Sequence, residues 1–217
     1  MKTKYNKDYY ENGVAKGISG YDNYRWIPEL TYPMAYSISK NLNIKKNDKV
    51  LEFGCAHGFL VKALNDFKID TYGVDVSRYA LSKVDTSIKN KINLLKNNNI
   101  KNSLKKMNVN FKFDHIISKD VFEHIEPNDL RKILKEMSKI TKYLFVVVPL
   151  GDNGKYRIES YEGDKTHVIA ENENWWKRLF LENKFKVKSF SYKIDGIKDK
   201  WYSVNPKGNG FFKLVSK

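Results

Sequence analysis

Cysteine is almost absent from this chain of 217 residues, in which Cys55 is the only one. A single thiol cannot form an intrachain disulfide or supply a multi-cysteine zinc site, and it is typical of a reducing compartment. Long apolar runs are absent as well. No stretch approaches the roughly 18–20 apolar residues that a membrane-spanning helix needs, and the polar start lacks the apolar segment of a secretory signal. We therefore expect a cytoplasmic protein without a membrane span.

Arginine is scarce although the chain is strongly basic. Lysine and arginine together number 40 against 25 acidic residues, which gives a formal net charge of +15. Surfaces that bind phosphate favour clustered arginine, because its guanidinium group makes bidentate contacts. The basic residues here are mostly lysines, spread along the chain among asparagines, as in proteins of AT-rich genomes. We therefore expect no dedicated nucleic-acid surface.

Helix and strand patterns alternate over the first 150 residues. Apolar residues at helical spacing predict helices over residues 27–42, 59–64, 78–84 and 127–140. Short apolar or alternating runs predict strands over residues 50–53, 69–76, 113–118 and 143–148. Ser77 and Pro127 stand where a helix N-terminus favours them. The segment 85–109 mixes asparagine tracts with isolated apolar residues, and its structure is left open.

The last third of the chain is richer in strands. Its pattern predicts a helix over residues 175–181, strands over 185–192 and 211–215, and a loop through Trp201. Alternating strands and helices that end in a strand-rich segment predict an α/β sandwich, with a mainly parallel sheet closed by an antiparallel, hairpin-like edge. The length and the 41% hydrophobic content fit a single domain.

A glycine-containing turn is the most informative segment of the sequence. Residues 50–60, Val-Leu-Glu-Phe-Gly-Cys-Ala-His-Gly-Phe-Leu, place a strand, a tight turn and a helix in succession. Gly54 and Gly58 let the backbone pass close to a ligand. Asp75 ends the next predicted strand, where a carboxylate accepts hydrogen bonds from a ribose diol. These features predict a nucleoside-containing cofactor, but not a dinucleotide, because Ala56 replaces the second glycine of the Gly-x-Gly-x-x-Gly fingerprint.

The motif at residues 52–58, an acidic residue followed by x-Gly-x-Ala-x-Gly, resembles the first motif of the class I S-adenosylmethionine-dependent methyltransferases. Three further segments follow in the order and spacing of that family: Gly-Val-Asp-Val-Ser at 73–77, Phe-Asp-His-Ile-Ile-Ser-Lys-Asp-Val-Phe-Glu-His-Ile at 113–125, and Leu-Phe-Val-Val-Val-Pro at 144–149. The resemblance implies a Rossmann-like, three-layer α/β sandwich with a mainly parallel seven-stranded sheet and an antiparallel C-terminal edge hairpin. It also implies S-adenosylmethionine (SAM) as the cofactor.

The resemblance assigns the cofactor-binding residues. They are Glu52, Gly54, Cys55, Ala56, Gly58, Asp75, Val76, Ser118 and Lys119. The turn would bring its backbone against the methionine part of SAM, and Glu52 would approach the amino end. Asp75 would hold the ribose hydroxyls and Val76 would lie against the adenine. The family often reads the adenine amino group with an acidic residue after the third strand, where this chain has asparagines at positions 97–99.

The single domain, residues 1–217, divides into three parts under this interpretation. Residues 1–26 form an aromatic arm or lid, residues 27–150 the cofactor-binding core, and residues 151–217 the acceptor loops and closing strands. The arm carries side chains suited to covering a cofactor or to packing on the surface: Tyr9, Tyr10, Tyr21, Tyr24, Arg25 and Trp26.

Methyl transfer to a hydroxyl needs a group that removes the proton, and His167 is the predicted general base. Asp164 precedes it by three residues in a glycine-containing loop after the strand predicted over residues 143–148, and we expect this carboxylate to orient the imidazole. The structural alternative is that Thr166 caps the following helix and His167 merely covers it. His57 and His115 are expected to be structural, and His124 to shape the floor of the cofactor site.

No metal site is expected, because the Asp, His and Glu residues form only a weak set and one cysteine excludes a thiolate site. Some sugar methyltransferases of the family do use a divalent ion held by carboxylates and histidine.

The predicted function is O-methylation of a sugar, glycan or other small-molecule hydroxyl. Segments at 19–26, 53–64 and 164–168 resemble bacterial family members associated with surface polysaccharide synthesis. Methylation of RNA or protein is the enzymatic alternative, and a non-catalytic cofactor-binding module is the second. Lysines near the predicted acceptor loops hint at an anionic acceptor: Lys155, Lys165, Lys198 and Lys200. The sequence indicates no oligomeric state.

Overall fold

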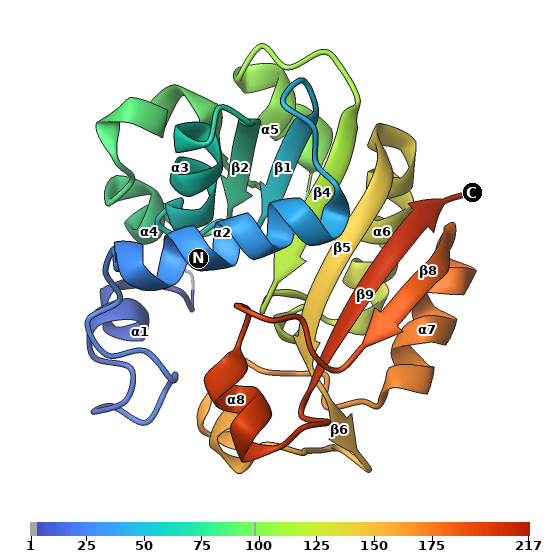
Figure 1. The fold of residues 1–217 in the computed structure, drawn as a ribbon. Helices are drawn as coiled ribbons and strands as arrows, with labels where there is room; N and C mark the ends of the chain where they lie inside the picture. Colours follow the sequence, from blue (N-terminus) through green and yellow to red (C-terminus); the bar gives the residue numbers. More distant parts are fainter. Residues whose placement is uncertain (1–3, 98) are drawn as a thin grey trace.

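The computed structural model describes residues 4–97 and 99–217, and a twisted sheet runs through its centre (Figure 1). Seven of the described strands form this sheet in the order β3-β2-β1-β4-β5-β9-β8. Their bounds are β1 Lys49–Phe53, β2 Asp70–Asp75, β3 Ile92–Leu94, β4 Phe113–Lys119, β5 Thr141–Pro149, β8 Phe185–Ser191 and β9 Asn209–Ser216. The first five strands in this order are parallel, whereas β9 runs antiparallel to both β5 and β8. The predicted parallel sheet with an antiparallel edge is confirmed.

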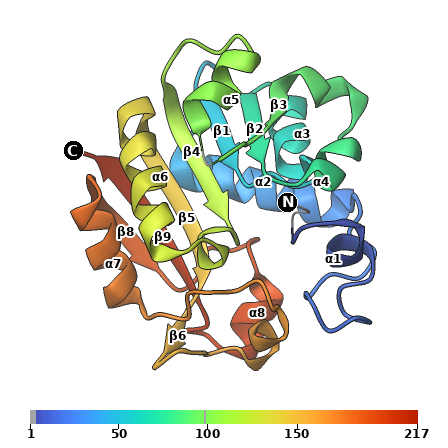
Figure 2. The ribbon, with the colours of Figure 1, turned by 180° about the vertical axis from the view of Figure 1, so that it is seen from behind.

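Helices cover both faces of the sheet and complete the three predicted layers. α2 (Pro28–Leu42) and α3 (Phe59–Asp66) pack on the face turned to the viewer in Figure 1. α5 (Ile100–Lys106), α6 (Pro127–Ile140) and α7 (Glu173–Glu182) pack on the opposite face, which Figure 2 shows. The apolar stripe of α6 is buried as its spacing predicts: Leu130, Ile133, Leu134 and Met137.

The remaining helical segments are short, and some differ from the prediction. They are α1 Lys7–Glu11, α4 Arg78–Ser82, η1 Thr86–Lys91, η2 Phe122–His124, η3 Glu159–Gly163 and α8 Asp199–Val204. The predicted loop through Trp201 is wrong, since α8 contains this residue, whose ring packs 5.3 Å from that of Tyr161. The segment left open supplies η1, β3 and α5. A small ladder of β6 (Gly151–Asp152) and β7 (Lys155–Tyr156) was also not predicted.

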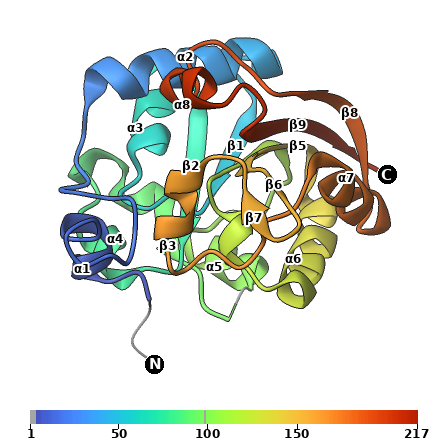
Figure 3. The ribbon, with the colours of Figure 1, turned by 90° about the horizontal axis from the view of Figure 1, so that it is seen from below.

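The N-terminal arm lies at the carboxyl ends of the parallel strands, on the same side of the molecule as the loop after β5 (Figure 3). Tyr9 and Tyr10 in α1 are each 4% exposed and form an aromatic cluster with Tyr21 and Tyr24. The arm is fastened to the sheet by a hydrogen bond from the Ser77 hydroxyl to the backbone oxygen of Tyr5. Ser77 also caps α4, as predicted.

The helices of residues 4–97 and 99–217 include none long and apolar enough to cross a bilayer.

The glycine at the start of the turn after β1 is required by sterics. Gly54 has φ +81°, and a Cβ there would lie 2.3 Å from a methyl carbon of Val121. Gly54→Ala is therefore expected to lower the free energy of unfolding by about 2–5 kcal/mol, the sum of left-handed strain and overpacking. Urea denaturation followed by circular dichroism measures this loss.

Two glycines in the arm separate these contributions. Gly17 has φ +61° with open space around its Cβ position, and Gly20 has open space without a left-handed backbone. Gly17→Ala is expected to cost about 1–2 kcal/mol and Gly20→Ala less than about 0.5 kcal/mol. Equal losses for Gly54→Ala and Gly17→Ala would show that the Val121 contact is unimportant.

Candidate active site

Asp75 organises the turn between β1 and α3. The N–H groups of Gly54 and Cys55 both donate to the carbonyl of Val74, and the Ala56 N–H donates to Asp75 Oδ2 over 2.8 Å. The Ser77 N–H donates to Asp75 Oδ1 over 2.7 Å. Burial raises the pKa of this 7% exposed carboxyl, and the two amide bonds act against burial. Each carboxylate oxygen keeps one lone-pair direction for a further donor, such as a ribose hydroxyl.

Glu52 and Ser118 end neighbouring strands with unused hydrogen-bonding capacity. Glu52 is 8% exposed and Ser118 is 1% exposed. Glu52 Oε2 and Ser118 Oγ have no hydrogen-bond partner within residues 4–97 and 99–217. Burial raises the pKa of Glu52 to about 8, with Lys119 acting in the opposite direction. Buried polar atoms without partners are costly, so this pair is suited to a polar, cationic ligand group.

Two of the predicted cofactor residues serve the fold through their side chains. The Cys55 thiol is buried against Val61 and Ile88, and burial raises its pKa. Only its backbone is therefore available to a ligand. Val76 is half-buried against the large core cluster. Of the three asparagines, Asn99 caps α5, Asn97 is exposed, and Asn98 lies outside the described residues.

Asp164 does not orient His167 directly, so that expectation is wrong. The Nδ1 atom of His167 lies 2.9 Å from the carbonyl oxygen of Tyr161. Asp164 instead accepts hydrogen bonds from the Tyr9 hydroxyl (2.9 Å) and from the backbone N–H and hydroxyl of Thr166 (2.8 and 2.6 Å). A carbonyl can only accept, so Nδ1 of His167 carries the proton and the lone pair lies on Nε2.

Thr166 links the carboxylate to a different histidine. The Thr166 hydroxyl donates its one proton to Asp164, and its Oγ1 atom lies 2.7 Å from Nδ1 of His124. Nδ1 of His124 must therefore donate to Oγ1, which leaves the imidazole lone pair of His124 on Nε2. The alternative in which Thr166 caps the next helix is excluded, because Asn172 caps α7. The sequence therefore placed the carboxylate correctly in the loop but assigned it to the wrong histidine.

The two histidine rings meet beside a buried carboxyl that the sequence interpretation missed. The ring centroids of His124 and His167 are 4.6 Å apart. Glu123 is 1% exposed, and its backbone oxygen accepts from the N–H groups of Val168 and Ile169, which holds the loop after β5 against η2. The adjacent Glu-His pair shortly after the strand predicted over residues 113–118 was the only available signal.

Burial disfavours the charged form of both histidines at this contact, so the pKa of each lies below the usual imidazole value. Burial lowers the pKa of His124 to about 4, and neighbouring His167 adds to the effect. Burial also lowers the pKa of His167, whereas Asp164 raises it. Burial, reinforced by Asp120, raises the pKa of Glu123.

The other two histidines are structural, as expected. His57 is 5% exposed among the rings of Tyr10, Tyr24 and Phe59, where burial lowers its pKa to about 4. His115 stacks on Tyr143 inside the sheet, away from the carboxyl ends of the strands.

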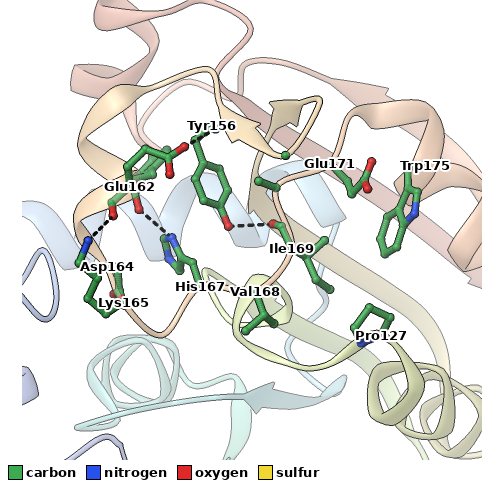
Figure 4. A pocket seen from close by; sticks show the side chains of 13 residues that line it. Pro127, Tyr156, Glu162, Asp164, Lys165, His167, Val168, Ile169, Glu171 and Trp175 are labelled. Atoms are coloured by element: carbon green, nitrogen blue, oxygen red, sulfur yellow. Dashed lines mark hydrogen bonds between the residues drawn. The ribbon is translucent and has the colours of Figure 1, made fainter.

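A cavity of about 410 Å³ opens beside His167 (Figure 4). It is lined mainly by the loop after β5 together with Pro127 and Trp175. The hydroxyl of Tyr156 donates to the carbonyl of Ile169 over 2.8 Å and braces this loop. The volume suits a small-molecule ligand.

Comparison with known proteins identifies the family. Residues 26–191 match the family model for a methyltransferase domain. The chain belongs to this family. It is a SAM-dependent methyltransferase. A search of curated proteins finds no match.

Solved structures of methyltransferases share the fold at low sequence identity. A SAM-dependent methyltransferase from Clostridium acetobutylicum is 14% identical, with a TM-score of 0.61 over 88% of this chain and 92% of that one. One from Archaeoglobus fulgidus is 15% identical, with a TM-score of 0.59 over 84% and 92%. Magnesium protoporphyrin IX methyltransferase from Synechocystis, solved with bound S-adenosylhomocysteine, is 13% identical, with a TM-score of 0.60 over 86% and 83%.

The side chains predicted to hold SAM fit this cofactor. Asp75 has lone pairs free for the ribose, and Glu52 and Ser118 offer buried acceptor atoms for the ammonium group. The most specific indication is Glu52 Oε2, which is buried without a hydrogen-bond partner among the described residues. A cationic group such as the ammonium group of SAM would supply that partner.

Binding of SAM is expected to release a proton from Glu52. At about pH 6.5 the carboxyl is protonated in the free methyltransferase, because its pKa is about 8. An adjacent ammonium favours the carboxylate, so up to about one proton leaves per SAM bound, and the affinity rises with pH by up to about tenfold per unit below pH 7.5. Calorimetric titration in buffers of different ionisation enthalpy measures this release. The Glu52→Gln variant should show none, and proton uptake by the unmodified protein would contradict the assignment.

Proposed function

We propose that this methyltransferase transfers the methyl group of SAM to a hydroxyl group of a sugar or another small molecule, with His167 as the general base. The observation that carries this proposal is the fixed tautomer of His167, whose Nδ1 is held by the Tyr161 carbonyl over 2.9 Å. Its Nε2 lone pair is thereby available to the acceptor hydroxyl, at the edge of the sheet where the residues predicted to bind SAM lie.

For methyl transfer, the protein mainly has to align the acceptor hydroxyl with the methyl group of SAM and to remove the hydroxyl proton. When bound, SAM supplies a methyl group on a positively charged sulfur, which leaves as a neutral thioether when the acceptor oxygen attacks in line. Nε2 of His167 accepts the proton that the hydroxyl loses. Asp164 lies near enough to raise the pKa of His167 and stabilises the imidazolium that forms. The arm docks on the loop after β5, because the Tyr9 hydroxyl donates to Asp164 and the Lys165 N–H donates to the Ile18 carbonyl.

The charges around the cavity favour an uncharged acceptor over the anionic one that the lysines hinted at. Lys198 is committed to Asp120, with Nζ 2.5 Å from Oδ1, and Lys119 binds Oδ2 of the same carboxylate over 2.5 Å. Burial opposes ionisation of Asp120, but the two ammonium groups outweigh it and hold its pKa below the usual value. The cavity lining itself has three acids and a single lysine: Glu162, Asp164, Glu171 and Lys165. Lys155 and Lys200 are exposed.

A labelled-methyl screen tests this function. The protein and SAM with an isotopically labelled methyl group are incubated with neutral sugars, nucleotide-linked sugars, other small alcohols, bulk RNA and a protein mixture. We expect the label in a small hydroxyl compound. Mass spectrometry should show it as a methyl ether that survives treatment with base. Label in RNA or protein would support the macromolecular alternative instead. Tight SAM binding without transfer to any of these acceptors would favour the non-catalytic module.

A further inference from the structure

We propose that Glu123, His124 and His167 form a binding site for one divalent transition-metal ion, which binds and activates the acceptor hydroxyl. One ligand atom from each of the three side chains lies within 4.8 Å of the other two. Ligands of a tetrahedral ion at ~2.1 Å are about 3.4 Å apart, so modest side-chain rotations close the site. The existence of the site is independent of the proposed function, whereas its purpose rests on it.

Both histidines have the outer hydrogen bonds that metal-binding histidines need. A histidine ligand usually donates its second ring N–H to a carbonyl or carboxylate, which fixes the ring and its tautomer. Nδ1 of His167 donates to the Tyr161 carbonyl, and Nδ1 of His124 donates to Thr166, which in turn donates to Asp164. Both Nε2 atoms therefore keep their lone pairs, and both rings are held from behind.

Glu123 provides a separate indication that a cation belongs here. Its side chain is 1% exposed, and Oε2 has no hydrogen-bond partner within residues 4–97 and 99–217. The nearby ammonium groups of Lys119 and Lys198 bind Asp120 instead. A bound metal ion would satisfy this buried oxygen, which no described protein group does.

The donor set indicates the class of metal. Two imidazoles and one carboxylate suit Zn²⁺, Fe²⁺ or Mn²⁺ and leave coordination positions open, whereas Ca²⁺ and Mg²⁺ prefer oxygen ligands. An acceptor hydroxyl at an open position has a lowered pKa and gives its proton to water. The role given to His167 as the base is thereby revised: with the ion bound, Nε2 of His167 is a ligand, and the ion takes over the activation of the hydroxyl. The loop after β5 contributes to the site through this single ligand.

Zn²⁺ serves as the probe in the test of the site. The full chain without a polyhistidine tag is stripped with EDTA, dialysed and titrated with ZnCl₂ in a calorimeter, with atomic emission as a check on stoichiometry. We expect about one ion per chain. Glu123→Gln, His124→Ala and His167→Ala should each weaken binding by at least about 100-fold, and Thr166→Val, which acts through His124, by about 10–100-fold. His115→Gln, a histidine away from the site, should leave binding unchanged.

Circular dichroism and SAM titration of each variant establish that it is folded. Zinc binding that Glu123→Gln and His167→Ala leave intact would overturn the site, as would the absence of binding to the unmodified chain. Full methyl transfer by the stripped protein would overturn its role in activating the hydroxyl. Failure of the proposed function would give a different result. Zinc binding would be unchanged, but no small hydroxyl compound would carry the labelled methyl group.

Discussion

Replacing Asp75 by alanine is expected to weaken SAM binding by about 100-fold or more. The substitution removes the acceptor for the ribose hydroxyls and also the acceptor for the Ala56 and Ser77 N–H groups, over 2.8 and 2.7 Å. Hydrogen bonds to a charged group contribute about 1.5–3 kcal/mol each, so the loss of two to the ligand gives this magnitude. Calorimetric titration with SAM measures the change directly.

The conservative variant Asp75→Asn separates loss of the ligand contact from loss of the turn. An amide keeps one acceptor oxygen and presents an NH₂ group to the other backbone donor, so we expect an intermediate loss of about tenfold. Asp70 at the opposite end of β2 offers a matched control, because it pairs only at that end, with Lys49 and Lys91. Asp70→Asn should leave SAM affinity within about twofold. An unaltered affinity in Asp75→Ala would place the cofactor elsewhere.

The sheet could be predicted because its signals are local. β5 is apolar on both faces, as a central strand must be, and the stripe on α6 has the period of a helix. The turn after β1 could be placed for the same reason, since glycines directly after a strand indicate a tight turn and Asp75 marks the end of the next strand. α8 could not, because its six residues show no apolar stripe, and packing of Trp201 on Tyr161 stabilises it.

The candidate catalytic residues show where sequence reasoning fails. Asp164 and His167 are three residues apart, which predicts contact, but the backbone of the loop directs the carboxylate to Tyr9 and Thr166 instead. The partner of Thr166 is His124, which lies 42 residues away in sequence. A contact of this range depends on the hydrogen bonds that dock the loop on η2, and spacing along the chain carries no information about it.

Substituting His167 by alanine is expected to lower the rate of methyl transfer by about 10²–10⁴-fold while SAM affinity stays within about twofold. The imidazole contacts Tyr161 and packs beside His124, whereas the residues assigned to SAM lie on β1, β2 and β4 or directly after β1 and β2. The acceptor found in the labelled-methyl screen is used for the rate, and calorimetry gives the affinity. His115→Gln is the control, since this buried histidine lies inside the sheet, and it should change neither quantity.

Comparison with Glu123→Gln decides between the two roles of His167. If the imidazole acts only as a base, the neutral glutamine keeps the shape of the pocket and the rate falls by less than about tenfold. If the three side chains bind an ion, Glu123→Gln and His124→Ala lower the rate as much as His167→Ala does, because each removes one of three ligands. The second result is the one we expect, since the Glu123 oxygen is buried without a partner and both Nε2 atoms have their lone pairs free. A normal rate in His167→Ala would exclude both roles and leave the histidine as a structural part of the loop.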